Sequence, residues 1–150
     1  MNKNDYDILF LLKYLNKCLE QDLDINLKNH DLTATQGRVV FFIYIKEKNN
    51  ERATPTDLMN RFSLSKSTVS ELIDRLVAKK LVDKINEKNR VYLLTTDYSK
   101  DLIHAFDIAR NKTKEQLTQG LDEEQAKQIK EYILKMIHNI KGDDAICGNK

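Results

Sequence analysis

Glycine and proline are scarce in this chain of 150 residues, and so is cysteine. The chain has 4 glycines and 1 proline, too few for the many tight turns of a β-sandwich or β-barrel. No uncharged apolar run reaches the roughly 18 residues that a membrane-spanning helix needs. The 2 cysteines, Cys18 and Cys147, are far apart and outside any Cys-x-x-Cys motif, so we expect neither a disulfide framework nor a zinc finger.

Apolar and charged residues are plentiful instead, at 41% and 32% of the chain. This content suits a single globular domain with its own core, and the scarcity of glycine and proline favours a mainly helical fold. The first residues lack the basic and then apolar layout of a signal peptide. We therefore expect a cytoplasmic protein with no membrane partner.

Basic residues are concentrated in the middle third of the chain. Residues 52–90 contain nine Lys and Arg against five Asp and Glu, whereas acids outnumber bases in the two flanks together. A polyanion such as nucleic acid is the natural partner of a basic segment. An ordinary solvated surface is equally compatible with the charge alone.

Apolar spacing and capping residues predict six helices. We expect them at about 5–28, 33–48, 55–61, 65–79, 98–118 and 122–141. The first has a wide apolar arc that one small domain would struggle to cover, which indicates a partner subunit. The fourth has an apolar face made of Val69, Leu72, Ile73, Leu76 and Val77.

Between the fourth and fifth helices the apolar period changes to that of strands. Runs 81–85 and 91–94 are β-prone and flank a polar stretch, 86–90, that suits a hairpin turn. A short helix, a turn, an amphipathic helix and a basic hairpin follow the order of a winged helix-turn-helix. The predicted fold class is therefore mainly α with a small β-hairpin wing.

In a winged helix-turn-helix, the second helix of the pair enters the DNA major groove and the wing lies along the backbone or minor groove. Hydroxyl and basic side chains at these places can reach base edges and phosphates. The candidate DNA-binding residues are Thr56, Ser65, Lys66, Ser67, Thr68, Ser70, Arg75, Lys79, Lys84, Lys88 and Arg90. Two adjacent helices and a hairpin also occur in unrelated domains, so the order alone does not prove this function.

Short motifs along nearly the whole chain add to this interpretation. They are Leu32-Thr33 with Gln36, Thr56-Asp57-Leu58, the run from Ser65 to Ser70, Leu76, Leu81-Val82, Leu94-Thr95 and Leu121-Asp122-Glu123-Glu124. In these motifs the chain resembles the MarR family of bacterial transcription regulators. The resemblance implies one domain, residues 1–150, with dimerisation helices at about 5–32 and 98–141 and the winged helix-turn-helix at about 33–97.

The same resemblance implies an obligate homodimer whose two winged helices face one double-stranded DNA with a pseudo-palindromic operator. It further implies a repressor that loses its affinity for DNA when a small-molecule effector binds. The family's effector cavity lies between the dimer helices and the winged helix. Tyr14, Phe41 and Tyr44 are our candidates for lining it.

The chain departs from the family pattern in the wing and in the recognition helix. The interval from Leu81 to Thr95 is a few residues short and lacks the usual Asp-x-Arg, so Arg90 is an approximate counterpart of the family's minor-groove arginine. Glu71 stands where many members carry a basic residue. Its carboxylate could accept a hydrogen bond from a cytosine amino group or orient Arg75.

Catalytic and metal sites find little support. The chain has no Gly-rich phosphate loop, no His-Glu-x-x-His and no nucleophile elbow, so we expect neither an enzyme nor a cofactor. His30, His104 and His138, with Glu20 as a fourth candidate, lack the spacing of a metal site, and we assign no metal.

Cys18 invites comparison with the thiol-based oxidant sensors of the same family. Their reactive cysteine would fall nearer Phe10, so we expect Cys18 to be a small apolar filler. A redox- or metal-sensing regulator of the same fold, and a helical dimer that binds protein or RNA, remain the alternatives. A steep salt dependence and discrimination between an operator and random duplex would separate DNA recognition from the last of these.

Overall fold

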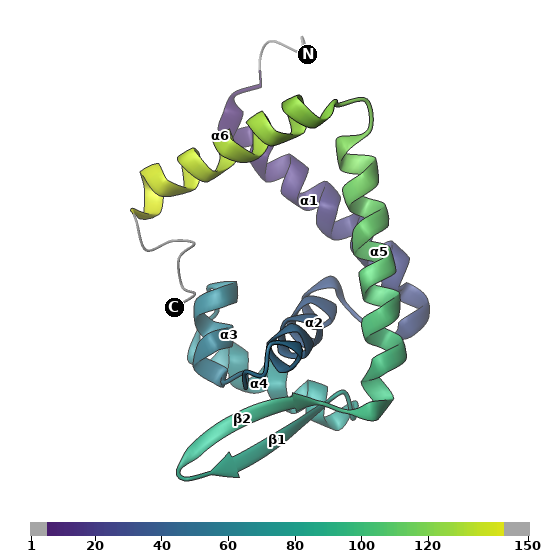
Figure 1. Cartoon of the computed structure of the whole chain (residues 1–150), viewed down its shortest axis with the longest axis vertical. Coiled ribbons are helices and arrows are strands. Elements are labelled where there is room, and N and C mark those ends of the chain that lie inside the picture. The colour runs from purple at the N-terminus through teal and green to yellow at the C-terminus, as the bar shows by residue number, and fades with distance from the viewer. Residues whose placement is uncertain (1–5, 143–150) are drawn as a thin grey trace.

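The computed structural model describes residues 6–142, so Cys147 lies outside the described residues. Within this range the chain forms six α-helices and one antiparallel hairpin (Figure 1). The elements are α1 (Ile8–Leu27), η2 (Lys28–His30), α2 (Ala34–Lys48), α3 (Pro55–Phe62), α4 (Lys66–Ala78), β1 (Val82–Glu87), β2 (Arg90–Thr95), η3 (Asp97–Ser99), α5 (Lys100–Thr118) and α6 (Glu123–Lys141). The predicted helices and the predicted fold class are confirmed.

The helices begin where side chains satisfy their free backbone N–H groups. Thr33 caps α2: its hydroxyl accepts from the Gln36 N–H at 3.2 Å, and the Gln36 side chain accepts from the Thr33 N–H. Thr54 and Asp57 form the same reciprocal pair at the start of α3, where a proline occupies the first turn. These capping boxes fix the entry to both helices.

Helix α2 lies at the centre of the fold and packs against both α5 and β2. Val39 and Ile43 of α2 are completely buried. A Cβ added at Gly37 would lie 2.5 Å from the ring of Phe106 on α5, so only glycine permits this approach of the two helices. In Figure 1, α2–α4 and the hairpin form the lower part of the molecule, and α5 rises from it to carry α6.

Three carboxylates on α1 connect this helix to the elements beside it. Glu20 binds the Arg38 guanidinium of α2 through both oxygens, at 2.8 Å for the Nη2 contact. Asp24 accepts from the Ala34 N–H at 2.7 Å, and Asp22 accepts from the Thr113 hydroxyl of α5. Charged partners and a helix N-terminus make these stronger than neutral contacts. Glu20, a candidate metal ligand by sequence, is thus a partner of arginine.

Large apolar side chains on α1 and α6 remain exposed in the single chain. Leu9 and Tyr132 are each 60% exposed, Ile140 is 82% exposed, and no described residue of α6 is buried. Cys18 is exposed as well, so the expectation that it fills a core is wrong for the single chain. None of the helices within residues 6–142 is long and apolar enough to cross a membrane.

Two local predictions need correction. The strands are longer than predicted, because Glu87 pairs with Arg90 and leaves only Lys88 and Asn89 as the turn. Both turn residues have positive φ, 48° and 61°, which is the geometry of a tight type I′ hairpin. Val77, which the apolar spacing predicts on the buried face of α4, is 39% exposed because it lies at the edge of that apolar arc.

Candidate nucleic-acid interface

The polar start of α4 is organised by its capping residue. Ser63 ends α3 with φ 52°, and the chain re-enters a helix at Ser65. The Ser65 hydroxyl accepts from the Thr68 N–H at 3.2 Å and lies 2.8 Å from the Thr68 hydroxyl and 3.1 Å from that of Ser67. Ser65 and Thr68 therefore shape the helix start, and their exposed neighbours project from it.

Helix α4 presents one buried and one exposed face. Val69, Leu72, Ile73 and Leu76 are buried against the rest of the fold. The exposed face holds the predicted contact residues Lys66, Ser67, Ser70 and Arg75. Arg75 lies 3.9 Å from the carboxylate of Glu71, one turn away, which favours the second of the two roles considered for this acid. Thr56 is also exposed, in the first turn of α3.

Lys79 lies at the far end of α4 and points back to the protein. Its ammonium donates to the Asp31 carbonyl at 2.6 Å and to the Gln36 side chain at 3.3 Å, and lies 3.4 Å from the Asp31 carboxylate. The structure therefore does not bring Lys79 together with the exposed residues at the start of the helix. Sequence periodicity could not reveal this, because Asp31 and Lys79 are distant in the chain.

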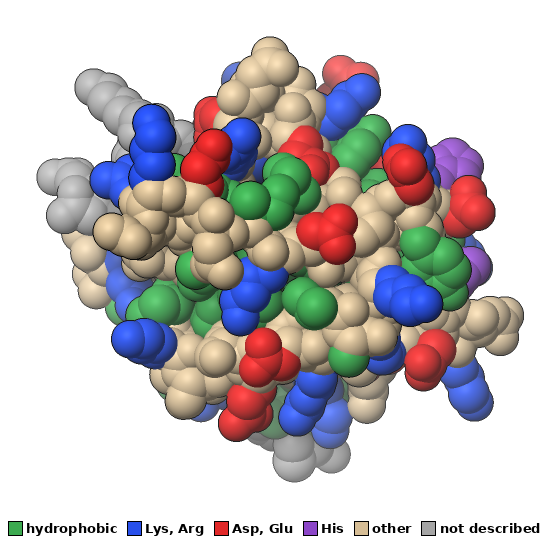
Figure 2. Space-filling model, turned by 90° about the horizontal axis from the view of Figure 1, so that it is seen from below, with side chains coloured by type: hydrophobic (Ala, Val, Ile, Leu, Met, Phe, Trp, Pro, Cys, Tyr) green, Lys and Arg blue, Asp and Glu red, His purple; other side chains and the backbone are tan. Residues whose placement is uncertain are grey.

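The wing extends from the same side of the molecule as α4. Lys84 lies 3.6 Å from the Asp74 carboxylate of α4. Lys88 occupies the turn and Arg90 begins β2; both are exposed, and neither forms an ion pair within the described part of the chain. Seen from below, basic and acidic side chains alternate over this face and no uniformly basic patch covers it (Figure 2). The tip of the wing thus carries the two basic side chains without acidic partners.

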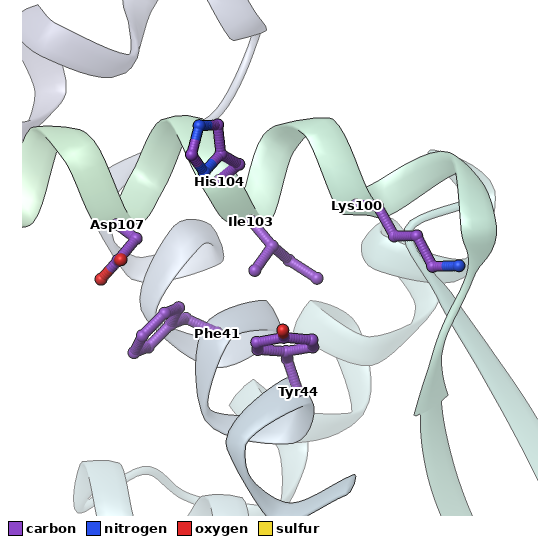
Figure 3. A pocket seen from close by; sticks show the side chains of 6 residues that line it. All are labelled: Phe41, Tyr44, Lys100, Ile103, His104 and Asp107. Carbon is purple, nitrogen blue, oxygen red and sulfur yellow. The ribbon is translucent and has the colours of Figure 1, made fainter. Parts of the chain in front are cut away.

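A pocket of about 280 Å³ lies between α2 and α5. Its lining residues are Phe41, Tyr44, Lys100, Ile103, His104 and Asp107. Figure 3 shows the rings of Phe41 and Tyr44 on α2 facing α5, with Ile103 above them. The two ring centroids are 6.4 Å apart.

Charged groups frame this pocket. Asp97 hydrogen-bonds Lys100 at 2.7 Å, an interaction that lowers the pKa of Asp97 and raises the pKa of Lys100. Arg110 lies 3.2 Å from Asp107 and 5.0 Å from the centre of the Phe41 ring. Two of the three predicted pocket residues, Phe41 and Tyr44, therefore line one cavity, and the Lys100–Asp97 ion pair lies at one end of it.

Tyr14 does not line this pocket. It lies on the N-terminal half of α1, where its ring stacks on Phe10 with the centroids 5.9 Å apart. Among the described residues, no group of three or more His, Cys, Asp or Glu is arranged to hold a metal ion. His104, another candidate metal ligand by sequence, lines the pocket instead.

Comparison with known proteins relates this geometry to a family. The model of the MarR family matches residues 30–90. No curated protein sequence matches the chain. Among solved structures, the complex of S. aureus MepR with DNA is 23% identical, with a TM-score of 0.84, and the match covers 93% of this chain and 100% of that one.

Two further structures give the same picture. S. aureus MepR in its DNA-binding conformation is 23% identical with a TM-score of 0.80, and the match covers 91% of this chain and 100% of that one. The transcription regulator MarR of Oenococcus oeni PSU-1 is 26% identical with a TM-score of 0.73, covering 88% and 99%. Residues 30–90, which hold α2–α4, β1 and the hairpin turn, thus match the model of the MarR family, and the chain has the fold of these solved regulators nearly throughout.

Proposed function

We propose that this protein is a sequence-specific DNA-binding transcription regulator of the cytoplasm. The observation that carries the proposal is the exposed polar face at the start of α4, beside a wing whose tip bears Lys88 and Arg90. A helix of this kind fits the major groove, and a basic hairpin suits the adjacent backbone or minor groove. The similarity to MepR in complex with DNA supports the same function.

The regulator acts as a homodimer. The apolar faces of α1 and α6 support this, because they are too extensive to be left in water by a stable monomer. Two-fold symmetry would place two α4 helices on successive major grooves of a pseudo-palindromic operator.

Alanine variants on α4 test the readout of sequence. Ser67→Ala or Ser70→Ala should change the preference at one base pair by about 1–3 kcal/mol, because removal of a hydrogen bond to a base relaxes specificity. Lys66→Ala or Arg75→Ala should weaken binding to all sequences alike and reduce the salt slope by about one unit for each phosphate that is no longer neutralised. Fluorescence anisotropy with an operator found by footprinting the DNA beside the gene measures both.

The matched control is Lys127→Ala, which removes a positive charge from α6, outside the proposed interface. It should leave operator preference unchanged. If all four α4 substitutions left operator binding intact, α4 would not be the recognition helix.

The regulator is a repressor that a small molecule releases from DNA. The pocket between α2 and α5 suits an aromatic ligand, because Phe41 and Tyr44 can stack on a ring and Lys100, paired with Asp97, offers a hydrogen-bond donor at one end. It borders α5, which joins the winged helix to α6. A ligand there is placed to alter the separation of the two α4 helices.

Two substitutions at Tyr44 test the pocket with a ligand found by a thermal-shift screen. Tyr44→Leu keeps the apolar volume of the side chain but removes its ring. The dissociation constant of the ligand should therefore rise about two- to tenfold, which corresponds to the free energy of one aromatic pair. Tyr44→Phe keeps the ring and is the control. Calorimetric titration measures the affinity, and equal binding by wild type and Tyr44→Leu would place the effector elsewhere.

A further inference from the structure

Strand β1 has almost no buried packing in the outer part of the wing. In β1 only Val82, at the base, is buried, and every residue from Asp83 to Glu87 is exposed. On β2 the deepest residue is Leu93, which also pairs with Ala53 in the connection between α2 and α3. Val91 of β2 is partly buried against the core, whereas its partner Asn86 on β1 and both turn residues are exposed. A two-stranded hairpin is only marginally stable in water by itself, so contacts that hold the outer part of β1 help to fix the direction of the wing tip.

One side chain outside the hairpin supplies such contacts. Arg52, just before Ala53, places its guanidinium 5.1 Å from the centre of the Tyr92 ring and donates to the Glu87 carboxylate. The strand register pairs Glu87 with Arg90, so the acid that Arg52 binds lies directly across from the basic residue at the tip. Arg52 thus spans from the α2–α3 connection to the last residue pair of the wing.

The opposite face of the hairpin has a second connection. Strand residues alternate between faces, so Lys84 faces away from Glu87. Lys84 contacts Asp74 of α4. The wing is held by one ion pair on each face, and only the Arg52 pair reaches its end.

We propose that Arg52 is a positioning residue that fixes the wing tip through Tyr92 and Glu87 and so presents Lys88 and Arg90 to DNA. This inference rests on the proposed DNA-binding function. A planar guanidinium suits the role, because it stacks on a ring and binds a carboxylate at the same time. Without the Arg52 contacts, each wing tip would become ordered only when it binds DNA, and the conformational entropy lost in that step would lower the affinity.

The direction in which Glu87→Gln changes the affinity for DNA separates this positioning role from a simple effect of charge. Glu87 is an acid near the proposed phosphate path, so its neutralisation alone should strengthen DNA binding. It would also free Arg52 for any direct phosphate contact. If Arg52 instead needs Glu87 to hold the wing, Glu87→Gln should weaken binding, by about three- to tenfold for an exposed pair present twice in a dimer.

Two matched variants complete the DNA experiment. Asp83→Asn removes an exposed acid from the same face of the hairpin without touching the Arg52 contacts, so it should not weaken binding. The double variant Arg52→Ala/Glu87→Gln keeps the wild-type net charge, so its loss of affinity would not come from charge. We expect the double variant to bind no worse than Arg52→Ala alone, because the two residues act as one unit.

Relaxation of the backbone ¹⁵N nuclei in the DNA-free protein tests the positioning role of Arg52 independently of DNA binding. In Glu87→Gln and Arg52→Ala, the order parameters at Lys88 and Asn89 should fall from about 0.85 towards 0.6 or below. In Asp83→Asn, the order parameters at these two residues should stay at the wild-type value. Unchanged order parameters in the first two variants, or tighter DNA binding by Glu87→Gln, would overturn the proposal. A wild-type protein that binds no operator would overturn the proposed function instead, while the order parameters would still decide whether Arg52 braces the wing.

Discussion

Loss of the two positive charges at the wing tip should flatten the salt dependence of DNA binding by about three to four units in log K against log salt. The variant is Lys88→Ala/Arg90→Ala, and each proposed dimer would then lack four side chains that we expect to contact phosphates or the groove. Neither residue has an acidic partner within the described part of the chain, so both charges are available to DNA. Lys84 should contribute less, because it is paired with Asp74.

Anisotropy titrations at several salt concentrations measure this slope. The preferred operator sequence should stay the same, since phosphate contacts carry no base information. Lys127→Ala/Lys130→Ala removes two charges from α6 and serves as the control with an unchanged slope. An unchanged slope for the wing variant would mean that the short wing does not reach DNA.

Arg90 alone allows a finer distinction. If it enters the minor groove, Arg90→Ala should weaken operators flanked by A-tracts more than operators with mixed flanks, because narrow A·T-rich grooves attract arginine. The two operators must share their major-groove half-sites. Equal losses on both would identify a backbone contact.

The second large effect is expected at the subunit interface. Ile133→Glu places a carboxylate in the middle of the apolar face of α6, between Ile129 and Ile137. Two buried and unpaired charges in a symmetric dimer should weaken association by at least about 3–5 kcal/mol. Sedimentation at micromolar concentration should therefore detect monomers, and operator affinity should fall by about a hundredfold or more because each half-site is then bound separately.

The control for this variant lies on the same helix. Lys135→Glu introduces the same side chain on the polar face of α6 and should stay dimeric. A dimeric Ile133→Glu protein with wild-type operator affinity would show that α6 takes no part in the interface.

Local sequence signals account for most of the fold. Pro55 between Thr54 and Asp57 marks the start of α3 because capping chemistry lies within four residues. The hairpin turn is harder to predict. Lys88 and Asn89 adopt left-handed conformations without the glycine that normally signals a two-residue turn, so the predicted turn is longer than the observed one.

The roles of single side chains at the site depend on contacts between distant segments. By its spacing Lys79 belongs to the exposed face of α4, yet its ammonium hydrogen-bonds Asp31, just before the start of α2. Arg52 is only one more positive charge in the sequence, and the fold places it beside Tyr92. Tyr14 and Phe41 are both aromatic residues on predicted helices, and only the packing of α2 on α5 assigns one of them to the pocket.

In the proposed dimer, the carboxylates of α1 have a mechanical consequence. Asp22 holds α5 at Thr113, and α5 continues from there for about 20 Å to its start at Lys100, next to the base of the wing. Helix α5 can therefore pivot as a rigid body about the hydrogen bond between Asp22 and Thr113. A tilt of about 10° at Thr113 moves the other end by about 3.5 Å, more than the length of a hydrogen bond to a base. A disturbance of one contact at α1 would therefore be amplified into a misfit of α4 in the major groove that we propose it enters.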